Sequence, residues 1–455
     1  MNPLTLKQIA DWSGGALIQG TPASVLSSVS TDSRSVGTED LFIALKGERF
    51  DAHEFIEQVG EQGAAAILAS SLPAATESFS GGIIHLRDTL KGLQNLARGY
   101  RNSLSGIRVV GLTGSNGKTS TKDFLGGVLS SAFTVSKTKG NLNNHIGVPL
   151  TVLSSDNSHQ YGVWEMGMNH PGEIEVLAEI ARPDIAVVTN IGTAHIENMG
   201  TREAIAEEKS QLPLAVSADG YCVMPRDDDF FEFVAERVLG EMISVGFECG
   251  DVRAASLRVD DSGRVHFDLV SEFADATPIS LPVRGRHMVS NALLAAAVGL
   301  KEGLTPAQIA GGLSSVTLTG GRLEEKKVGG FSILDDSYNA NPDSMEAALL
   351  TLQEAALKGR RVAVLGYMGE LGHIEEEAHL ALGEKAAALG VDLLITVGEK
   401  ASRINTRAQS IGVNLNFPTH AEAAGYLKGE LTSEDLVLVK GSRGATMEKV
   451  IEGLQ

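Results

Sequence analysis

At roughly 150 residues per domain, a chain of 455 residues is long enough for about three domains, each with its own core. Its 43% hydrophobic and 21% charged residues suit a soluble α/β enzyme and exclude a disordered or fibrous protein. The formal net charge of -19 argues against binding to nucleic acid or to an anionic membrane surface. An anionic ligand therefore needs local basic groups and backbone amides.

The ends and the cysteines of the chain indicate a location. Cys222 and Cys249 form no C-x-x-C motif, which fits a reducing compartment. Residues 1–15, MNPLTLKQIADWSGG, lack the basic start and apolar core of a signal peptide. No uninterrupted apolar run approaches the length of about 20 residues that crosses a bilayer. We expect a cytoplasmic protein without integral membrane association.

The first predicted domain covers residues 1–87. Short strand-like and helical patterns alternate there, as in residues 39–50, EDLFIALKGERF, followed by residues 51–70, DAHEFIEQVGEQGAAAILAS. This pattern predicts a small α/β domain.

The second predicted domain covers residues 88–315. A helical pattern at 92–102, GLQNLARGYRN, precedes the strand-like run 107–113, IRVVGLT. Further strand-like runs recur between helical segments, which favours a mostly parallel sheet with helices on both faces. They are YGVWEMG (161–167), DIAVVTNIG (184–192) and GYCVMPRDD (220–228).

The third predicted domain covers residues 316–455 and is expected to be Rossmann-like. Residues 318–330, LTGGRLEEKKVGG, have the glycines and charges of an exposed connection. The strand-like runs that follow are FSILDDSYN (331–339), RRVAVLGYM (360–368), DLLITVGEK (392–400) and DLVLVKGSR (435–443). The fold class is therefore predicted as α/β with three domains.

The segment GLTGSNGKTSTK, residues 111–122, resembles a phosphate loop, although the usual G-x-x-x-x-G-K-[ST] pattern requires glycine where this chain has Leu112. A strand pattern precedes it and a helix pattern follows it, as such a loop requires. Its glycines let backbone amides converge on phosphate oxygens, while Lys118 supplies a cation and Thr119 a hydroxyl for Mg²⁺. The alternative is a glycine-rich turn with a surface lysine. The predicted nucleotide contacts are Gly114, Ser115, Asn116, Gly117, Lys118, Thr119 and Ser120.

Two residues with metal-binding side chains follow strand-like runs of the second domain. Glu165 and His195 would lie at the carboxyl edge, where open α/β sheets bind ligands. A carboxylate is a natural Mg²⁺ ligand, whereas histidine is a less usual one. His195 is therefore read equally well as a hydrogen-bonding residue. The motif and these two residues leave kinase, GTPase and ligase open.

Across all three segments the chain resembles the Mur ligase family of ATP-dependent, amide-bond-forming enzymes. The short form TGSNGKT is that family's own phosphate loop, which accounts for Leu112. The resemblance also rests on TKGNLNNHIGVPLT (138–151), EMGMNHPGEI (165–174), TNIGTAHIENMG (189–200), GRHMVSNALLAAA (285–297), DDSYNANPDS (335–344) and VKGSRGATME (439–448).

Within the family, DDSYNANP and GNLNNHIGVPLT resemble the ligases that add D-alanyl-D-alanine to UDP-N-acetylmuramoyl-tripeptide. The D-N-P-R or D-D-P-R signature typical of diaminopimelate- or lysine-adding ligases is absent from the sequence. The resemblance implies that ATP phosphorylates the tripeptide carboxylate and that the dipeptide amine then displaces phosphate. It leaves another Mur-type ligase or a folylpolyglutamate-type ligase as the nearest alternative, and a kinase or an ATP-driven switch as more distant ones.

The resemblance also implies roles for particular residues. Thr119, Glu165, His195 and Lys209 would hold Mg²⁺, with Lys209 carbamylated by CO₂, because an unmodified ammonium has no lone pair to offer a metal. Without the family, Lys209 reads as a solvated helix lysine beside Glu207 and Glu208. The implied catalytic residues are Lys118, Glu165, His195, Lys209 and Arg322, and the implied further nucleotide contacts are Asn291, Arg322, Asp336 and Asn339.

Substrate contacts implied by the resemblance lie in all three domains. In the first domain, basic and hydroxyl side chains would hold the uridine diphosphate. Taken alone, D-S-R is a common turn and K-G-E-R-F-D-A-H a charged loop. The first-domain contacts are Ser30, Asp32, Ser33, Arg34, Lys46, Gly47, Asp51 and His53, and those elsewhere are Asn141, Asn143, Asn144, Asn341, Lys440, Ser442 and Arg443.

The sequence departs from the family pattern at three positions. Met288 replaces an asparagine near the adenine, which leaves Asn291 as the adenine candidate. Gln211 and Tyr367 each replace a carboxylate, for which Glu370 is a candidate substitute. The sequence does not distinguish diaminopimelate from lysine in the donor; we expect a monomer.

Overall fold

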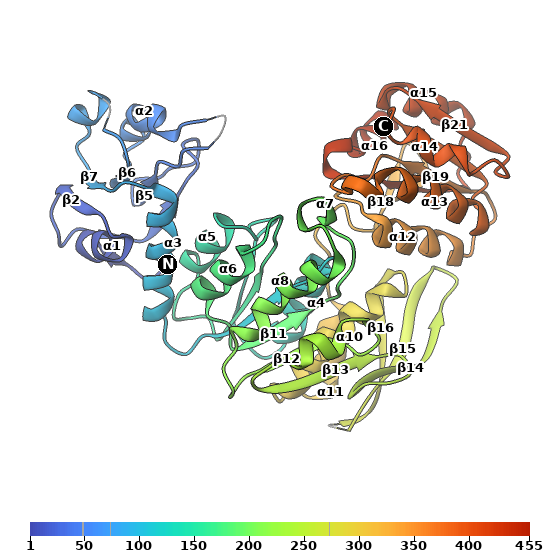
Figure 1. The fold of residues 1–455 in the computed structure, drawn as a ribbon, viewed down its shortest axis with the longest axis horizontal. Helices are drawn as coiled ribbons and strands as arrows, with labels where there is room; N and C mark the ends of the chain where they lie inside the picture. Colours follow the sequence, from blue (N-terminus) through green and yellow to red (C-terminus); the bar gives the residue numbers. More distant parts are fainter. Residues whose placement is uncertain (48–49, 73, 273) are drawn as a thin grey trace.

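Figure 1 shows a computed structural model, which describes residues 1–47, 50–72, 74–272 and 274–455. Three mostly parallel sheets of five, nine and six strands follow one another along the chain. The first and third of these units lie at opposite ends of the second (Figure 1). The predicted α/β class is confirmed, whereas the division after residues 87 and 315 stays a prediction.

The first unit is built on a sheet of order β2-β7-β6-β5-β4, in which only β2 is antiparallel to its neighbour. Its central strands are apolar and fully buried, as at Leu41 and Ile67. The strands are β2 Ala16–Gln19, β4 Ser28–Ser30, β5 Asp40–Ile43, β6 Ala66–Ala69 and β7 Gly82–His85, with the separate pair β1 Leu4–Thr5 and β3 Val25–Leu26. The helices are α1 Leu6–Ser13 and α2 Ile56–Glu61, with 3-10 turns η1 Ala52–Phe55 and η2 Ala74–Ser78.

The central unit follows α3, Thr89–Ser103, whose first turn is capped by the side chain of Asp88. Seven of its strands run parallel in the order β14-β13-β12-β11-β8-β10-β9. They are β8 Arg108–Thr113, β9 Val135–Lys137, β10 Tyr161–Glu165, β11 Ile185–Val188, β12 Tyr221–Pro225, β13 Glu241–Gly246 and β14 Val252–Val259. The helices are α4 Lys118–Ser130, α5 Gly147–Leu153, α6 Glu173–Ala181, α7 Ile196–Met199, α8 Arg202–Leu214, α9 Phe231–Ala235, α10 His287–Lys301 and α11 Pro306–Ser314.

An antiparallel extension completes the central sheet and was not predicted from the sequence. β15, Arg264–Ser271, pairs with β14 on one side and with β16, Ala274–Arg284, on the other. The signal was present, because Asp260 and Gly263 form a turn between two runs of alternating polarity. Gly263 adopts a φ of 81°, which suits glycine at such a turn.

The C-terminal unit has the strand order β17-β18-β22-β19-β20-β21, and all pairs except β17-β18 are parallel. The strands are β17 Glu324–Val328, β18 Phe331–Asp336, β19 Arg361–Leu365, β20 Leu393–Val397, β21 Val413–Phe417 and β22 Leu436–Lys440. The helices are α12 Pro342–Glu354, α13 Glu375–Ala388, α14 Ser402–Thr406, α15 His420–Glu430 and α16 Glu448–Gly453, with 3-10 turns η3 Gly372–Ile374 and η4 Arg443–Ala445.

The expected exposed connection at 318–330 was wrong in part, because β17 lies within it. β17 is an edge strand, so its charged side chains can face water while its backbone pairs with β18. Lys326 also bonds Asp335 across the two strands at 2.6 Å. Within the described ranges, no helix has the length and apolar character needed to cross a membrane.

Candidate active site

The phosphate-loop sequence connects β8 to α4 and is shaped by its two glycines. Gly114 has a φ of 150°, and a β-carbon there would come within 1.8 Å of the Thr189 hydroxyl oxygen. Gly117 has a φ of 78°, and a β-carbon there would come within 2.4 Å of Asn291 Oδ1. Leu112 lies inside β8 and is fully buried. The position that differs from the usual motif therefore belongs to the core strand and not to the loop.

Oxygen atoms that suit a divalent cation meet at the start of α4. The hydroxyl of Thr119 donates to Glu165 Oε2 at 2.9 Å, and Asn143 Nδ2 donates to Glu165 Oε1 at 2.7 Å. Glu165 is the last residue of β10 and is 2% exposed. Mg²⁺ is usually held by one or two carboxylates together with substrate phosphates and water, so this small donor set fits it. Among the described residues, no group of three or more His, Cys, Asp or Glu side chains is arranged around a metal position.

Two lysines of this region interact with each other through their charges, Lys118 half-buried and Lys209 fully buried. Lys118 Nζ bends back over the loop and donates to the carbonyl of Gly114 at 2.7 Å. Burial lowers the pKa of Lys118, while the charge of Glu165 opposes that shift. Lys209, on α8, is 1% exposed; burial and the charge of Lys118 place its pKa well below the ordinary value. Lys209 is thus a core lysine and not the solvated helix lysine of the alternative reading.

A cavity of about 1110 Å³ lies between the central and C-terminal units. The phosphate loop forms part of one wall, and the loops after β18, β19 and β22 form part of the other. The predicted site residues that line it are Ser115, Asn116, Gly117, Lys118, Thr119, Ser120, Asn141, Asn143, Asn144, Glu165, His195, Asn291, Arg322, Asp336, Asn339, Asn341, Lys440, Ser442 and Arg443. Gly114 and Lys209 do not belong to this lining.

Several polar contacts join the two walls. Asn341 Nδ2 donates to Asn116 Oδ1 of the phosphate loop at 2.8 Å. Asp343, in the first turn of α12, accepts from the amide of Thr193 at 3.1 Å. His195 Nδ1 lies 2.5 Å from Glu370 Oε2, and hydrogen bonding to His195 lowers the pKa of Glu370. The structure therefore has the C-terminal unit docked on the phosphate loop and on the loop that precedes α7.

The C-terminal wall is held together by its own polar groups. Lys440 Nζ lies 2.5 Å from Asp336 Oδ2 and also donates to the carbonyl of Asn339 at 2.9 Å. Burial raises the pKa of Asp336, against the charge of Lys440. Ser442 donates to the carbonyl of Ala340 at 3.0 Å. Lys440 and Ser442, both buried, thus support the loop after β18.

Two cations of this wall are placed differently. The guanidinium of Arg322 lies 3.9 Å from the centre of the Tyr338 ring, a cation–π contact that positions it at the cavity edge. Arg443 has an exposed side chain that bonds Glu448 at 3.0 Å, and its amide faces Asn339 Oδ1 at 3.4 Å. A planar guanidinium at this edge is suited to bidentate contact with phosphate or carboxylate.

The predicted uridine diphosphate contacts of the first unit do not line this cavity. Arg34 pairs with Asp32 at 2.7 Å, and this bond lowers the pKa of Asp32 to about 2. His53 Nδ1 lies 2.5 Å from Asp51, whose pKa is lowered to about 2 mainly by that bond. The remaining predicted contacts of this unit also bond within it. Ser30 bonds the Asp32 carbonyl, and the Ser33 carbonyl accepts from Gln58. Lys46 pairs with Asp51, and the Gly47 amide donates to the Phe50 carbonyl.

The three departures from the family pattern are placed as follows. Met288 is buried in the lining, with its sulfur 3.6 Å from Asn291 Nδ2. Gln211 bonds back to the carbonyl of Glu207 on its own helix. Tyr367 lines the cavity beneath the ammonium of Lys400, which lies 5.6 Å from its ring centre.

Sequence reasoning missed several residues that shape the site. Asn190 follows β11 and accepts from the amide of Asn116 at 2.9 Å. His287 lines the cavity, and burial lowers its pKa to about 4. Glu208 accepts from the amides of Gly172 and Ile174, which ties α8 to the start of α6. Asn190 and Asp343 carried a readable signal, since one follows a core strand and the other lies in a first helical turn. The sequence around His287 and Glu208 carried no such signal.

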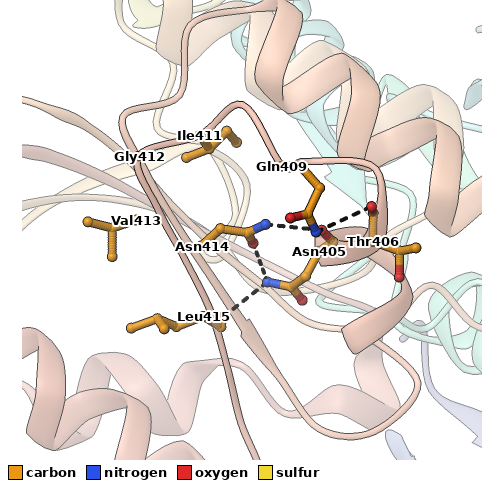
Figure 2. Close-up of a pocket in the computed structure, with 8 residues that line it drawn as sticks. All are labelled: Asn405, Thr406, Gln409, Ile411, Gly412, Val413, Asn414 and Leu415. Atoms are coloured by element: carbon orange, nitrogen blue, oxygen red, sulfur yellow. Dashed lines mark hydrogen bonds between the residues drawn. The ribbon is translucent and has the colours of Figure 1, made fainter.

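A second cavity, of about 450 Å³, lies between α14 and β21, away from this site (Figure 2). Its asparagines bond one another: Asn405 Nδ2 donates to Asn414 Oδ1 at 2.5 Å, and Asn414 Nδ2 donates to the carbonyl of Asn405 at 3.0 Å. No titratable side chain lines it.

A phosphate loop at the carboxyl edge of a parallel sheet, covered by the polar loops of a second α/β unit, defines a protein that handles a phosphorylated ligand between two domains. Three family descriptions match the chain: "Mur ligase family, catalytic domain" at residues 25–101, "Mur ligase middle domain" at 112–299 and "Mur ligase, glutamate ligase domain" at 321–443. The chain belongs to the Mur ligase family.

Individual relatives match over nearly their whole length. A protein of Bacillus subtilis strain 168 named UDP-N-acetylmuramoyl-tripeptide--D-alanyl-D-alanine ligase is 38% identical, over 99% of this chain and 98% of its own. A crystal structure of MurF from Acinetobacter baumannii has a TM-score of 0.91 at 34% identity, over 100% and 99% of the two chains. MurF ligase from Thermotoga maritima in complex with ADP has a TM-score of 0.83 at 31% identity, over 94% and 96%.

Proposed function

We propose that this protein is an ATP-dependent ligase that joins D-alanyl-D-alanine to UDP-N-acetylmuramoyl-tripeptide. The observation that carries the proposal is the cavity between the two units, with the phosphate loop on one wall and Arg322 on the other. The full-length similarity to ligases of that name supports the choice of substrates. The reaction is a cytoplasmic step of peptidoglycan precursor synthesis, carried out by a monomer on small molecules.

The chain's residues divide the work of a phosphoryl transfer followed by an acyl transfer. The amides of residues 117–119 and the ammonium of Lys118 hold the ATP phosphates and bring the tripeptide carboxylate into line with the γ-phosphate. That carboxylate displaces ADP to give an acyl phosphate. The dipeptide amine then attacks the acyl carbon, phosphate leaves, and the amine loses a proton. The docked C-terminal unit keeps water away from the acyl phosphate.

Thr119 and Glu165 would hold Mg²⁺, with His195 on the same cavity wall. When bound, the cation neutralises phosphate charge and so lets two anions approach each other. Arg322, held against Tyr338, supplies a second positive group to the transferred phosphoryl. Asn291, Asp336 and Asn339 complete the nucleotide contacts. The acyl end and the dipeptide are surrounded by Asn141, Asn143, Asn144, Asn341, Ser442 and Arg443. Lys440 supports these residues.

Lys209 is proposed to carry a carbamate. Only a neutral amine attacks CO₂, and burial lowers the pKa of Lys209, which increases its neutral fraction. The modification would place a negative charge near the ammonium of Lys118, and the attraction between the two charges would stabilise the carbamate. Its oxygens would join the metal ligands.

The first unit is proposed to dock the uridine diphosphate through residues 30–34, 46–47, 51 and 53. We place the domain boundaries after residues 87 and 315, so that this docking unit and the two catalytic units are distinct.

One assay tests the function. The full chain is incubated with ATP, Mg²⁺, D-alanyl-D-alanine and the UDP-tripeptide in its diaminopimelate or lysine form. ADP release and product mass are then recorded. We expect ADP release only with both substrates and a mass equal to the UDP-pentapeptide. Efficient reaction of a single amino acid with a shorter donor would move the assignment to a neighbouring ligase. A product that retains phosphate would move it to the kinases.

A further inference from the structure

Glu370 belongs to the C-terminal unit, but its side chain reaches the central one. Its Oε2 lies 2.5 Å from Nδ1 of His195, although the two atoms are not aligned as a regular hydrogen bond. The backbones are joined as well, because the amide of Glu197 donates to the carbonyl of Glu370 at 3.1 Å. Gly372 packs on the same residue, since a β-carbon there would come within 3.2 Å of the Glu197 α-carbon. The loop that carries Glu370 therefore lies directly on the loop that carries His195.

Both residues of this contact have left-handed backbones. The φ of His195 is 64° and that of Glu370 is 59°. Residues other than glycine rarely adopt this region, and those that do are concentrated at functional sites. Two such residues in direct contact across a domain boundary indicate that both loops accept backbone strain to make this contact.

The ring chemistry of His195 gives the contact a consequence. A carboxylate at Nδ1 favours the tautomer with its proton there, which leaves the Nε2 lone pair available. Histidine ligands of metals commonly have a carboxylate as the partner of their other ring N–H, and Glu370 is the carboxylate placed beside Nδ1 here. His195 lines the same cavity as Thr119 and Glu165, whose oxygens fit Mg²⁺.

We propose that Glu370 is a positioning residue that holds His195 with Nε2 directed to the divalent cation. Because Glu370 comes from the C-terminal unit, the metal site gains this support only while that unit is docked. Metal affinity and domain docking are then linked. The inference rests on the proposed function and adds to it a residue that acts on the metal through His195.

The test measures Mn²⁺ binding by electron paramagnetic resonance on the full chain with saturating ADP. In Glu370→Gln we expect roughly tenfold weaker Mn²⁺ binding, since outer partners of metal ligands contribute about 10- to 100-fold. In the His195→Ala background, Glu370→Gln should cause no further loss, as a double-mutant cycle requires for a residue acting through another. Glu376→Gln is the matched control, because Glu376 is an exposed carboxylate six residues along the same segment.

Two results would overturn the proposal: wild-type Mn²⁺ affinity in Glu370→Gln, or an equal loss from that substitution whether or not His195 is present. Glu370→Asp keeps the carboxylate, so the Mn²⁺ affinity of this variant should lie between those of the wild type and Glu370→Gln. Weaker Mn²⁺ binding by Glu370→Asp than by Glu370→Gln would also contradict the proposal. Thermal unfolding midpoints check that each variant is folded. We expect the Glu370 variants to fold, because the side chain of Glu370 is half-exposed. Product formation by the wild type is scored separately, so a failure of the ligase assignment is recognised as such.

Discussion

The side-chain amide of Asn341 links the first turn of α12 to the phosphate loop. Its Nδ2 donates to Asn116 Oδ1 at 2.8 Å, while its Oδ1 caps α12 by accepting from the amide of Ser344 at 2.9 Å. One residue thus starts a helix of the C-terminal unit and docks that helix on the nucleotide-binding loop of the central unit.

The two roles of Asn341 can be separated by substitution. Asn341→Asp keeps the capping oxygen but loses the amide donor, so we expect near-normal thermal stability and a kcat reduced about tenfold or more. Asn341→Ala loses both and should also lose about 1 kcal/mol of stability, the usual contribution of a helix cap. Unfolding curves and steady-state kinetics measure the two effects. Equal stability of the two variants would contradict the capping role of Asn341. Full activity of Asn341→Asp would contradict its docking role.

Lys118 and Glu165 are expected to be catalytic and not structural. Lys118→Ala and Glu165→Ala should each reduce turnover by at least about 100-fold, because removal of a group that stabilises transition-state charge typically costs that much. Circular dichroism should match the wild type, since both side chains line the cavity. Lys7→Ala is the control, an exposed lysine of the first unit. A folded Lys118→Ala protein with near-normal turnover would remove the phosphate loop from the mechanism.

The carbamate on Lys209 makes a prediction about chemical rescue. Lys209→Ala should be nearly inactive, and acetate or formate should restore part of the activity by supplying carboxylate oxygens. Lys209→Arg should not be rescued, because a guanidinium fills the space and keeps the charge. The measurement is product formation against carboxylate concentration. Full activity of Lys209→Ala, or no carbamate mass on protein kept under CO₂, would contradict the assignment.

Asp51 predicts a dependence of stability on pH. The bond to His53 lowers its folded pKa to about 2 from an ordinary value of 3.8. A carboxyl with a depressed folded pKa stabilises the fold above its unfolded pKa, and the benefit is lost as pH falls through the folded value. Asp51→Asn should therefore melt at a lower temperature than wild type at pH 6, and the difference should shrink between about pH 4 and pH 2. A difference that stays constant over this range would exclude the linkage.

Much of the fold was readable because local patterns and tertiary structure agree. The apolar run of β8, the two loop glycines and the helix from Lys118 are each recognisable from neighbours along the chain. Glu165 and His195 follow core strands, so the common edge of a parallel sheet brings them to one cavity. β17 and the antiparallel extension were missed because a charged edge strand and a short turn resemble exposed loops until their partner strands are known.

The sequence by itself determined the three α/β units, the phosphate loop and the set of polar residues at strand ends. Each of these depends on neighbours along the chain, through strand alternation, helix periodicity and glycine backbone freedom. Only the tertiary structure decided that Lys209 is buried, that Lys440 is engaged by Asp336, and that Glu370 reaches His195. Lys440 and Asp336 are separated by 104 positions in the sequence, and Glu370 and His195 by 175 positions. The burial of Lys209 depends on how a whole helix face packs. No local pattern records them, because burial and ion pairing are set by elements that meet only when the units dock.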